Sequence, residues 1–397
     1  MIPYQEAISL VTENVPILGT EDLETSEAAG RVMATDLVSR LSSPPFNKAA
    51  MDGFAVREAD VQELPAELSM VEETFAGQWP TDAVGPGQCA RITTGAPVPP
   101  GADMVVMVEH TEELPNGKVQ VKKLSGGNIC IKGEDVQEGE TVLEKGRLLN
   151  AIHLGVAGGA GHHRLTVYRR PSIAVLCTGE EVREPGVTVE KGQIYNANGP
   201  ILRSLLGPLA SEFSYLGIAG DDETELQSAV TQGLESDVFV LSGGVSAGEY
   251  DLVPDVLREM GVDILFHKWK IKPGKPALFG RRDGTCVFGL PGNPQSVFVT
   301  FHLLIRPALA AMQGAVDLPP RFRPGRITEN ISNKPGRRAF KPCRIEVEEA
   351  TNRVVPIPYH GSADIAASAD ADAFFTLPED CAGVKAGDLV EYFELPT

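Results

Sequence analysis

The sequence predicts a multidomain protein in which an α/β domain is combined with β-rich domains. Between about Arg170 and Pro319 apolar strand-like runs alternate with helical segments, as a parallel α/β sheet requires. From about Ser39 to Glu138 short β-like runs are separated by Pro/Gly-rich turns, and this texture returns after Pro320. With 397 residues, of which 42% are hydrophobic, the chain is long enough for roughly two to four domains.

The N-terminal segment, residues 1–38, is predicted to be helical. Ala7, Ile8, Val11 and Val15 follow one another at helical spacing. A second helical stretch starts near Asn150 and is followed by a glycine-rich stop signal. We expect the two stretches to pack together, so that residues 1–38 and 139–169 form one helical domain, split by an inserted β-rich domain at residues 39–138.

The α/β domain is assigned to residues 170–319 and a small C-terminal β domain to residues 320–397. A loop rich in glycine, Ser242–Gly248, follows one predicted strand directly. In open α/β sheets the carboxyl ends of the strands form the edge at which ligands bind. The predicted strands and helices are Ser172–Cys177, Gly199–Leu209, Phe213–Ala219, Glu223–Leu234, Asp237–Leu241 and Leu252–Met260 in the α/β domain, Met104–Val108 in the inserted domain, and Arg344–Glu348 and Leu389–Phe393 near the C-terminus.

Composition excludes several classes of partner. A net charge of −19 and a pI near 4.8 argue against general affinity for nucleic acid or anionic membranes. The six cysteines are scattered without a Cys-x-x-Cys pair, which favours reduced thiols. No leader-like segment opens the chain, and the most apolar helix candidate, Val297–Ala311, contains His302 and Arg306. We therefore expect a cytoplasmic protein in which any phosphate-binding site is confined to a small part of the surface.

The glycine loop has two interpretations. It lacks the lysine of a phosphate-binding P-loop and the spacing of a dinucleotide fingerprint, so it is either a tight turn or a ligand loop of another kind. The carboxylates that follow it favour a ligand loop, because exposed backbone N–H groups suit an anion and carboxylates suit Mg²⁺. Its candidate ligand-binding residues are Ser242, Gly243, Gly244, Ser246, Gly248 and Glu249.

A second candidate site combines lysines with rigid turns. Lys268, Lys270 and Lys272 would share one face of a strand, which is also typical of a solvated edge strand. Lys275, however, lies between Pro273-Gly274 and Pro276, which fix its backbone. Pro291, Gly292, Asn293 and Pro294 likewise form a rigid turn before a helix, a favourable place for phosphate.

These segments together resemble the molybdopterin molybdenumtransferases (the MoeA/gephyrin family) over essentially the whole chain. Each motif is weak alone, but their order is specific. In chain order the motifs are Met51-Asp-Gly53, Thr94-Gly-Ala-Pro-Val-Pro99, Gly133-Glu-Asp135, Thr178-Gly-Glu-Glu181, Ser242-Gly-Gly-Val-Ser246, Lys272-Pro-Gly-Lys-Pro276 and Leu290-Pro-Gly-Asn-Pro294.

The resemblance implies a four-part subunit in which the α/β domain is a three-layer molybdopterin-binding domain and the C-terminal domain is barrel-like. It implies a homodimer with a shared active cleft, in which the helical domain dimerises. The implied reaction uses adenylated molybdopterin and molybdate, requires Mg²⁺ and releases AMP. The adenylyltransferase that makes the substrate and the recipient molybdoenzymes are the implied protein partners.

The resemblance also implies roles for individual residues. The acids Glu181, Asp221 and Asp251 would hold the metal and the pterin, and Lys268, Lys272 and Lys275 would hold oxyanions beside Pro291 and Pro294. A dianion approaching a dithiolene and a phosphate requires such cations to offset repulsion. The implied site residues of the inserted domain are Asp52, Thr94 and Asp135, for each of which a turn or surface position is the alternative.

Two departures from the family pattern affect this assignment. Pro342 stands where many relatives carry arginine, so Arg344 is the candidate substitute, and Ser362 lies before an unusually acidic segment. Asn196 stands where Asp is common. Adenylation of molybdopterin and a non-catalytic molybdopterin-binding scaffold are the alternative functions, and the sequence does not separate molybdate from tungstate.

Overall fold

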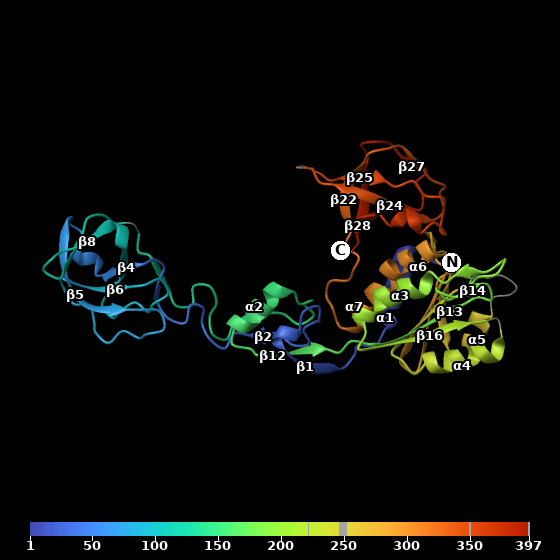
Figure 1. The fold of residues 1–397 in the computed structure, drawn as a ribbon, viewed down its shortest axis with the longest axis horizontal. Coiled ribbons are helices and arrows are strands. Elements are labelled where there is room, and N and C mark those ends of the chain that lie inside the picture. The colour runs from blue at the N-terminus through green and yellow to red at the C-terminus, as the bar shows by residue number, and fades with distance from the viewer. Residues whose placement is uncertain (125, 221, 246–251, 349–350, 396–397) are drawn as a thin grey trace. The chain divides into compact units, whose positions relative to one another are not determined.

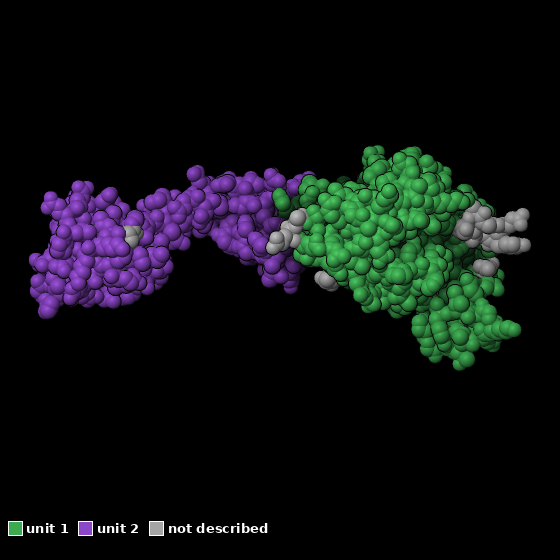
Figure 2. Space-filling model, turned by 90° about the horizontal axis from the view of Figure 1, so that it is seen from above, with its two compact units in different colours: residues 1–21, 146–148, 167–397 green, residues 22–145, 149–166 purple. Residues whose placement is uncertain are grey.

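In the computed structural model the chain forms two compact units. The structure describes residues 1–124, 126–220, 222–245, 252–348 and 351–395. Unit 1 contains residues 1–21, 146–148 and 167–397, and unit 2 contains residues 22–145 and 149–166 (Figures 1 and 2). The unit boundaries fall within strands β1 (Thr20–Glu24) and β12 (Arg164–Tyr168). The finer division into four domains stays a prediction.

The centre of unit 1 is a six-stranded sheet with the strand order β16-β13-β17-β21-β20-β18. Strands β16, β13, β17 and β21 run parallel, and β20 is antiparallel to both of its neighbours. The central strands are almost wholly buried, as expected for strands covered on both faces. The strands are β13 (Ser172–Thr178), β16 (Glu212–Ala219), β17 (Val238–Ser242), β18 (Asp263–His267), β20 (Leu278–Arg282) and β21 (Thr285–Leu290).

Helices cover both faces of this sheet and complete three layers (Figure 1). Helices α4 and α5 pack on one face, where Leu226 and Val256 belong to one apolar cluster with the sheet. Helices α1, α3, α6 and α7 pack on the other face, where Val11 and Leu202 belong to a second cluster. The helix bounds are α1 (Tyr4–Asn14), α3 (Asn198–Leu206), α4 (Glu223–Gly233), α5 (Val253–Glu259), α6 (Pro294–Thr300) and α7 (Arg306–Met312).

The two predicted helical stretches share a unit only in part: residues 22–38 lie in unit 2 with residues 149–166, whereas residues 1–21 lie in unit 1, and the pairing of the two stretches as one domain stays a prediction. Helix α1 buries Tyr4, Ala7 and Val11 in the core of unit 1, against residues that include Trp269. Helix α2 (Ala151–Gly159) instead belongs to unit 2. The apolar face of α1 therefore contributes to the α/β core, which the local helical pattern of residues 1–15 does not distinguish from a separate helical domain.

Helices α6 and α7 are joined by a π-helical turn at Phe301–Ile305 into one helix, Pro294–Met312. This helix is long and apolar enough to cross a membrane by length and composition, but 78% of its most apolar window is buried inside unit 1. It is thus a core helix, and it carries the turn at Asn293–Pro294 on its N-terminus.

The C-terminal region of unit 1 is a closed barrel. Strands β24, β25, β22, β28 and β26 follow one another, and β26 pairs back with β24 to close the ring. Strand β19 adds to the outside of β24. The bounds are β19 (Ile271–Lys272), β22 (Arg323–Ile327), β24 (Arg338–Glu346), β25 (Arg353–Pro356), β26 (Ala373–Leu377) and β28 (Leu389–Glu394), with a separate pair β23 (Ile331–Ser332) and β27 (Gly383–Val384).

Unit 2 is built around a second six-stranded sheet, with the order β7-β4-β6-β5-β9-β8. Phe54 and Val106 lie in its core. The β5–β6 pair is parallel, and the other described pairs of this sheet are antiparallel. The strands are β4 (Gly53–Val56), β5 (Ala66–Thr74), β6 (Gln88–Ile92), β7 (Met104–Met107), β8 (Thr111–Glu113) and β9 (Lys118–Val121), with the pairs β2 (Leu37–Val38) with β11 (Thr141–Leu143) and β3 (Lys48–Ala49) with β10 (Ile129–Cys130).

Candidate active site

The candidate site lies at the carboxyl ends of the parallel strands of unit 1. The chain passes from β13 to β16 on one side and then returns to β17 on the other side of β13. Strand order therefore reverses between β13 and β17, which is where open α/β sheets form a ligand-binding crevice. Strand β13 ends at Thr178 and β17 ends at Ser242, so the predicted glycine loop starts at this crevice.

The first two glycines of this loop are required by close packing. Gly243 and Gly244 have φ angles of 98° and 61°. A Cβ on Gly243 would lie 2.4 Å from the carbonyl oxygen of Thr178, and one on Gly244 would lie 2.7 Å from a methyl group of Val253. Only glycine fits both the conformation and the space. The backbone of the loop therefore lies directly against the end of β13.

Asn198 joins two of the predicted site segments. Its Nδ2 donates to Ser242 Oγ at 2.9 Å and to the carbonyl oxygen of Gly292 at 2.7 Å. Its buried Oδ1 has no partner among the described residues, and neither has the buried Oγ1 of Thr178. Sequence reasoning missed Asn198, although an asparagine directly before a predicted Gly-Pro helix start is a recognisable helix-start signal.

The turn at Pro291–Pro294 is held by the C-terminal region. Asn293 Nδ2 donates to Ser362 Oγ at 2.7 Å, and the backbone N–H of Gln295 donates to the carbonyl oxygen of Ser362 at 3.2 Å. The fully buried Gln295 also donates from Nε2 to Ser368 Oγ at 3.1 Å. The structure thus brings the predicted residues Asn293, Pro294 and Ser362 together.

The loop that carries Lys275 packs against the same helix. Trp269 Nε1 donates to the carbonyl oxygen of Gly274 at 2.8 Å. The backbone N–H of Trp269 donates to the carbonyl oxygen of Lys275 at 3.2 Å. A Cβ on Gly274 would lie 2.6 Å from Thr300 Oγ1. Lys272 and Lys275 are exposed and have no carboxylate partner within the described ranges. The loop that lies against α6 at Thr300 therefore carries two cations that no described carboxylate neutralises.

The predicted strand over the lysines is interrupted at Lys268. Its φ of 79° is left-handed, and its backbone N–H donates to Ala277 while its carbonyl oxygen accepts from Ile2. Lys268 is therefore not placed on one strand face with Lys270 and Lys272, as the alternation of residues predicts. A positive φ at lysine is uncommon and has no local sequence signal.

Glu181 lies beside the same crevice. It follows β13, is exposed, and its Oε2 would stand 2.8 Å from a Cβ placed on Gly179. The predicted residues Asp221, Ser246, Gly248, Glu249 and Asp251 lie outside the described residues. Within the described part of the chain no group of three or more His, Cys, Asp and Glu side chains forms a metal site.

An open cavity of about 550 Å³ adjoins Glu181 and is lined by residues that include Gly179, Arg183 and Glu184. Glu184 of this lining accepts through Oε1 from the Tyr215 hydroxyl at 2.5 Å, and that hydroxyl accepts from Asn196 Nδ2 at 2.8 Å. Burial, and then the hydrogen bond to Glu184, raise the pKa of Tyr215. Asn196 also accepts from the backbone N–H of Gly199 at 2.9 Å, so it supports the start of α3.

Arg344 does not stand free in the C-terminal barrel. Its Nη2 lies 2.9 Å from Asp370 Oδ2, in the acidic segment after Ser362. Pro342, by contrast, is buried on β24. The charge of Arg344 is thus already neutralised by a neighbour.

In unit 2 the structure brings Asp52 and Thr94 together. Asp52 Oδ1 accepts from the backbone N–H of Thr94 at 2.6 Å and from its hydroxyl at 2.9 Å. The backbone bond, followed by the hydroxyl bond, lowers the pKa of Asp52, so this exposed carboxylate is ionised at neutral pH. Asp135 is exposed on another loop, where its backbone N–H donates to Ser43.

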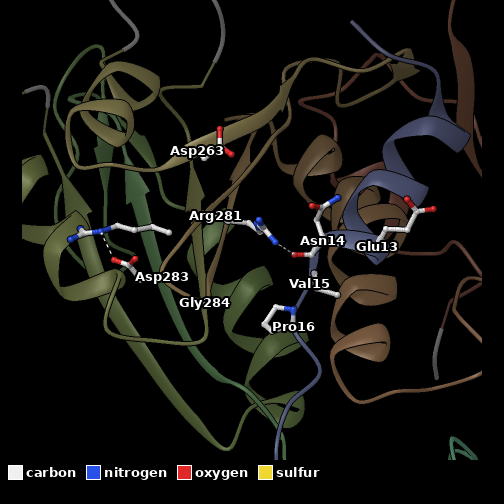
Figure 3. A pocket seen from close by; sticks show the side chains of 9 residues that line it. Glu13, Asn14, Val15, Pro16, Asp263, Arg281, Asp283 and Gly284 are labelled. Carbon is white, nitrogen blue, oxygen red and sulfur yellow. Dashed lines mark hydrogen bonds and ion pairs between the residues drawn. The ribbon is translucent and has the colours of Figure 1, made fainter.

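A second cavity, of about 400 Å³, lies at the opposite edge of the sheet in unit 1. Arg281 donates to the carbonyl oxygen of Asn14 at 3.1 Å, and Asp263, Asp283 and Glu13 add carboxylates (Figure 3). It adjoins the turn that precedes β21, whereas Pro291 follows the end of that strand. None of the predicted site residues that the structure describes lines it.

Comparisons with known proteins match the whole chain. Three family models match in order: the MoeA N-terminal region (domain I and II) over residues 2–161, the probable molybdopterin binding domain over residues 174–311, and the MoeA C-terminal region (domain IV) over residues 324–395. Among solved structures, the molybdopterin biosynthesis MoeA protein from Pyrococcus horikoshii OT3 has a TM-score of 0.84 and 30% identity, with 100% of each chain covered.

Curated relatives are similar over the same length. The chain is 35% identical over 402 residues to the molybdopterin molybdenumtransferase of Haemophilus influenzae strain Rd, with 98% of each chain covered. It is 31% identical over 396 residues to the molybdopterin molybdenumtransferase of Staphylococcus aureus strain Mu50, which covers 98% of this chain and 94% of the relative.

Proposed function

The chain belongs to the molybdopterin molybdenumtransferase (MoeA) family, and we propose that it transfers molybdenum from molybdate to adenylated molybdopterin, with release of AMP. The observation that carries the proposal is that three segments contact helix α6: the Lys272–Lys275 loop, the Pro291–Pro294 turn and the segment of Ser362. The loop adjoins Ser296 and Thr300 through Gly274, and Ser362 bonds to Asn293 and Gln295 at the start of the helix. These three segments come from distant parts of the sequence. Their convergence supports one anion-binding site in unit 1.

Lys272 and Lys275 bind the oxyanion substrate in this proposal. Molybdate is a dianion, and it must approach a dithiolene and a phosphate that are also negative. Two lysines without carboxylate partners among the described residues supply the positive charge that offsets this repulsion. Lys268, which is only partly exposed and has a left-handed backbone, is assigned to the same segment.

The adenylated pterin binds along the crevice between β13 and β17. The Ser242–Gly244 backbone and the Pro291–Pro294 turn line this crevice, and Asn198 holds both. The unpartnered oxygens of Thr178 and Asn198 are acceptors for donor groups of the substrate. Ser362 completes the turn from the C-terminal side, whereas Arg344, paired with Asp370, is a weaker candidate for substrate contact.

Mg²⁺ is assigned to Glu181 with Asp221 and Asp251. The donor set is made of carboxylate oxygens, which Mg²⁺ prefers, and Glu181 stands exposed at the end of β13. When bound, Mg²⁺ neutralises charge on phosphoryl oxygens of the anhydride. Glu181, as the described member of this set, orients the phosphate end of the substrate toward the strand edge.

We propose a homodimer in which Asp52, Thr94 and Asp135 reach the cleft of the partner subunit. Helix α2 supports the dimer, because Ala157 is the buried residue of this apolar helix while Ile152 and Val156 are 75% and 37% exposed. An apolar helix face in water favours association, and a second copy of this chain offers the same face. The ionised Asp52 would then meet donor groups of the substrate.

Several further assignments complete the proposal. The adenylyltransferase that supplies the substrate and the recipient molybdoenzymes are its protein partners. A cytoplasmic location is supported by the six cysteines, all of which are free thiols. Tungstate resembles molybdate in size and charge and remains an alternative oxyanion.

The test is AMP release from adenylated molybdopterin with Mg²⁺, measured with and without molybdate and followed by reconstitution of an apo-molybdoenzyme. We expect molybdate-dependent AMP release and an active reconstituted enzyme. Consumption of ATP with free molybdopterin, without AMP release from the adenylated form, would establish adenylation instead. Pterin binding with neither reaction would leave a scaffold role.

A further inference from the structure

The cations of strands β19 and β24 differ in whether a carboxylate neutralises them. Strand β24 carries Lys341, which has no carboxylate partner in the described parts of the chain. The other cations of β24, and Lys270 just before β19, are each paired, whereas Lys272 on β19 has no described carboxylate partner. The paired cations are Lys270 with Glu379, Arg338 with Glu391 and Arg344 with Asp370, at N–O distances of 3.6, 3.0 and 2.9 Å.

Strand register places Lys341 beside Lys272. Strands β19 and β24 are parallel, and Lys272 lies opposite Ala339. Paired residues on neighbouring strands lie on the same face of a sheet, and so do residues two apart on one strand. Lys341 therefore lies on the same face as Ala339 and Lys272. Two residues advance the strand by about 7 Å, a distance that the flexible four-carbon stems of two lysines readily close.

Lys341 is also partly withdrawn from water. Its Nζ donates to the carbonyl oxygen of Ser332 at 3.4 Å, a long hydrogen bond. Burial, and then the charge of Lys272, lower the pKa of Lys341. Lys341 is partly buried and Lys272 is exposed, and the repulsion between their like charges is offset when an anion lies between them.

We infer that Lys341 is a further oxyanion-binding residue, which together with Lys272 binds a tetrahedral dianion of the molybdate class. The inference rests on the proposed function and adds to it a residue of the barrel strand β24. Because Arg338 and Arg344 are neutralised by their own carboxylates, Lys341 is the cation that β24 contributes to the anion.

The test is calorimetric titration of the full-length protein with molybdate, using sulfate as a competing dianion. Lys341→Met removes the charge and keeps the length of the stem, and Lys341→Arg restores a charge. Lys270→Met is the matched control, since Lys270 is paired with Glu379. We expect roughly tenfold weaker molybdate binding for Lys341→Met, near-normal binding for Lys341→Arg and unchanged binding for Lys270→Met.

Unchanged binding by Lys341→Met would overturn the inference, as would equal losses in Lys341→Met and Lys270→Met, which would indicate a general field effect. An absence of molybdate binding by the unmodified protein would also overturn it. Trp269 closes the adjacent loop, so its fluorescence, measured in a Trp79→Phe background, reports whether the Lys341→Met variant keeps the local fold.

Failure of the proposed function is seen separately in AMP release by the unmodified protein. Lys341-dependent molybdate binding without AMP release would retain the anion site and remove the transferase assignment. Molybdate-dependent AMP release with full activity in Lys341→Met would retain the transferase assignment and remove Lys341 from the anion site.

Discussion

The two units hold their predicted site residues in different ways. In unit 1 the candidate site is held by contacts between distant segments, as in the bonds of Asn198 to Ser242 and Gly292. In unit 2 Asp52 and Thr94 are both exposed, and they bond directly to each other. Substitutions that remove these contacts in unit 1 should therefore affect both fold and activity. Substitutions of the exposed pair in unit 2, like those of exposed lysines in unit 1, should affect activity alone.

The largest expected effect is on the stability of unit 1. Gly243→Ala should lower the free energy of unfolding by about 2–4 kcal/mol, because its Cβ would lie 2.4 Å from the Thr178 carbonyl oxygen. Gly186 is the matched control, with a φ of 100° and open space around it. Gly186→Ala should cost only about 1 kcal/mol. Urea unfolding curves measure both, and equal losses would show that close packing at Gly243 is unimportant.

Lys275→Ala should separate activity from fold within unit 1. The side chain is exposed and the backbone of Lys275 is held by Trp269. We expect molybdate-dependent AMP release to fall about a hundredfold with an unchanged unfolding midpoint. Lys385→Ala, at an exposed position of the barrel region, is the control and should behave as the unmodified protein. Normal turnover of Lys275→Ala would remove its oxyanion role.

His302 should make the stability of unit 1 sensitive to acid. It is fully buried, both ring nitrogens lack partners among the described residues, and burial lowers its pKa from 6.5 to about 3. The folded histidine stays neutral while the unfolded one gains a proton, so stability is complete above pH 6.5 and falls as the pH drops toward 3.

This loss amounts to at most about 1.4 kcal/mol per pH unit. His302→Phe keeps an aromatic ring among Phe298, Phe301 and Phe393 and should remove that component. Unfolding free energies at pH 7 and pH 4.5 test this. An equal loss in both proteins would show that His302 does not carry the acid sensitivity.

The smallest effect on stability is expected in unit 2. Thr94→Val removes the hydroxyl bond that contributes to the lowered pKa of Asp52. A carboxylate whose pKa is lower in the folded state stabilises the fold at pH values above its unfolded pKa. This stabilisation is lost as the pH falls through the folded pKa. Because Asp52 is fully exposed, the unfolding midpoint at pH 7 should not change measurably. A clear shift would contradict the contrast between the units.

The sequence predicted those parts of the site that local patterns encode. Buried apolar runs gave β13 and β17 correctly, and the Pro-Gly motifs located the turns at Lys275 and Asn293. It missed Asn198 and Gln295, because their bonds join residues 94 and 73 positions apart. The left-handed Lys268 was missed because tertiary contacts with Ile2 and Ala277 determine its backbone.

Subunit complementation tests the central claim most directly, namely that Lys275 of unit 1 and Asp52 of unit 2 act in one cleft shared by two copies of the chain. Inactive Lys275→Ala and Asp52→Ala proteins are mixed under conditions of proven subunit exchange, and molybdate-dependent AMP release is measured. Half of the dimers should be mixed and each should hold one intact cleft, which predicts about a quarter of the unmodified activity. No recovered activity despite exchange would contradict the claim and place both residues in the cleft of a single chain.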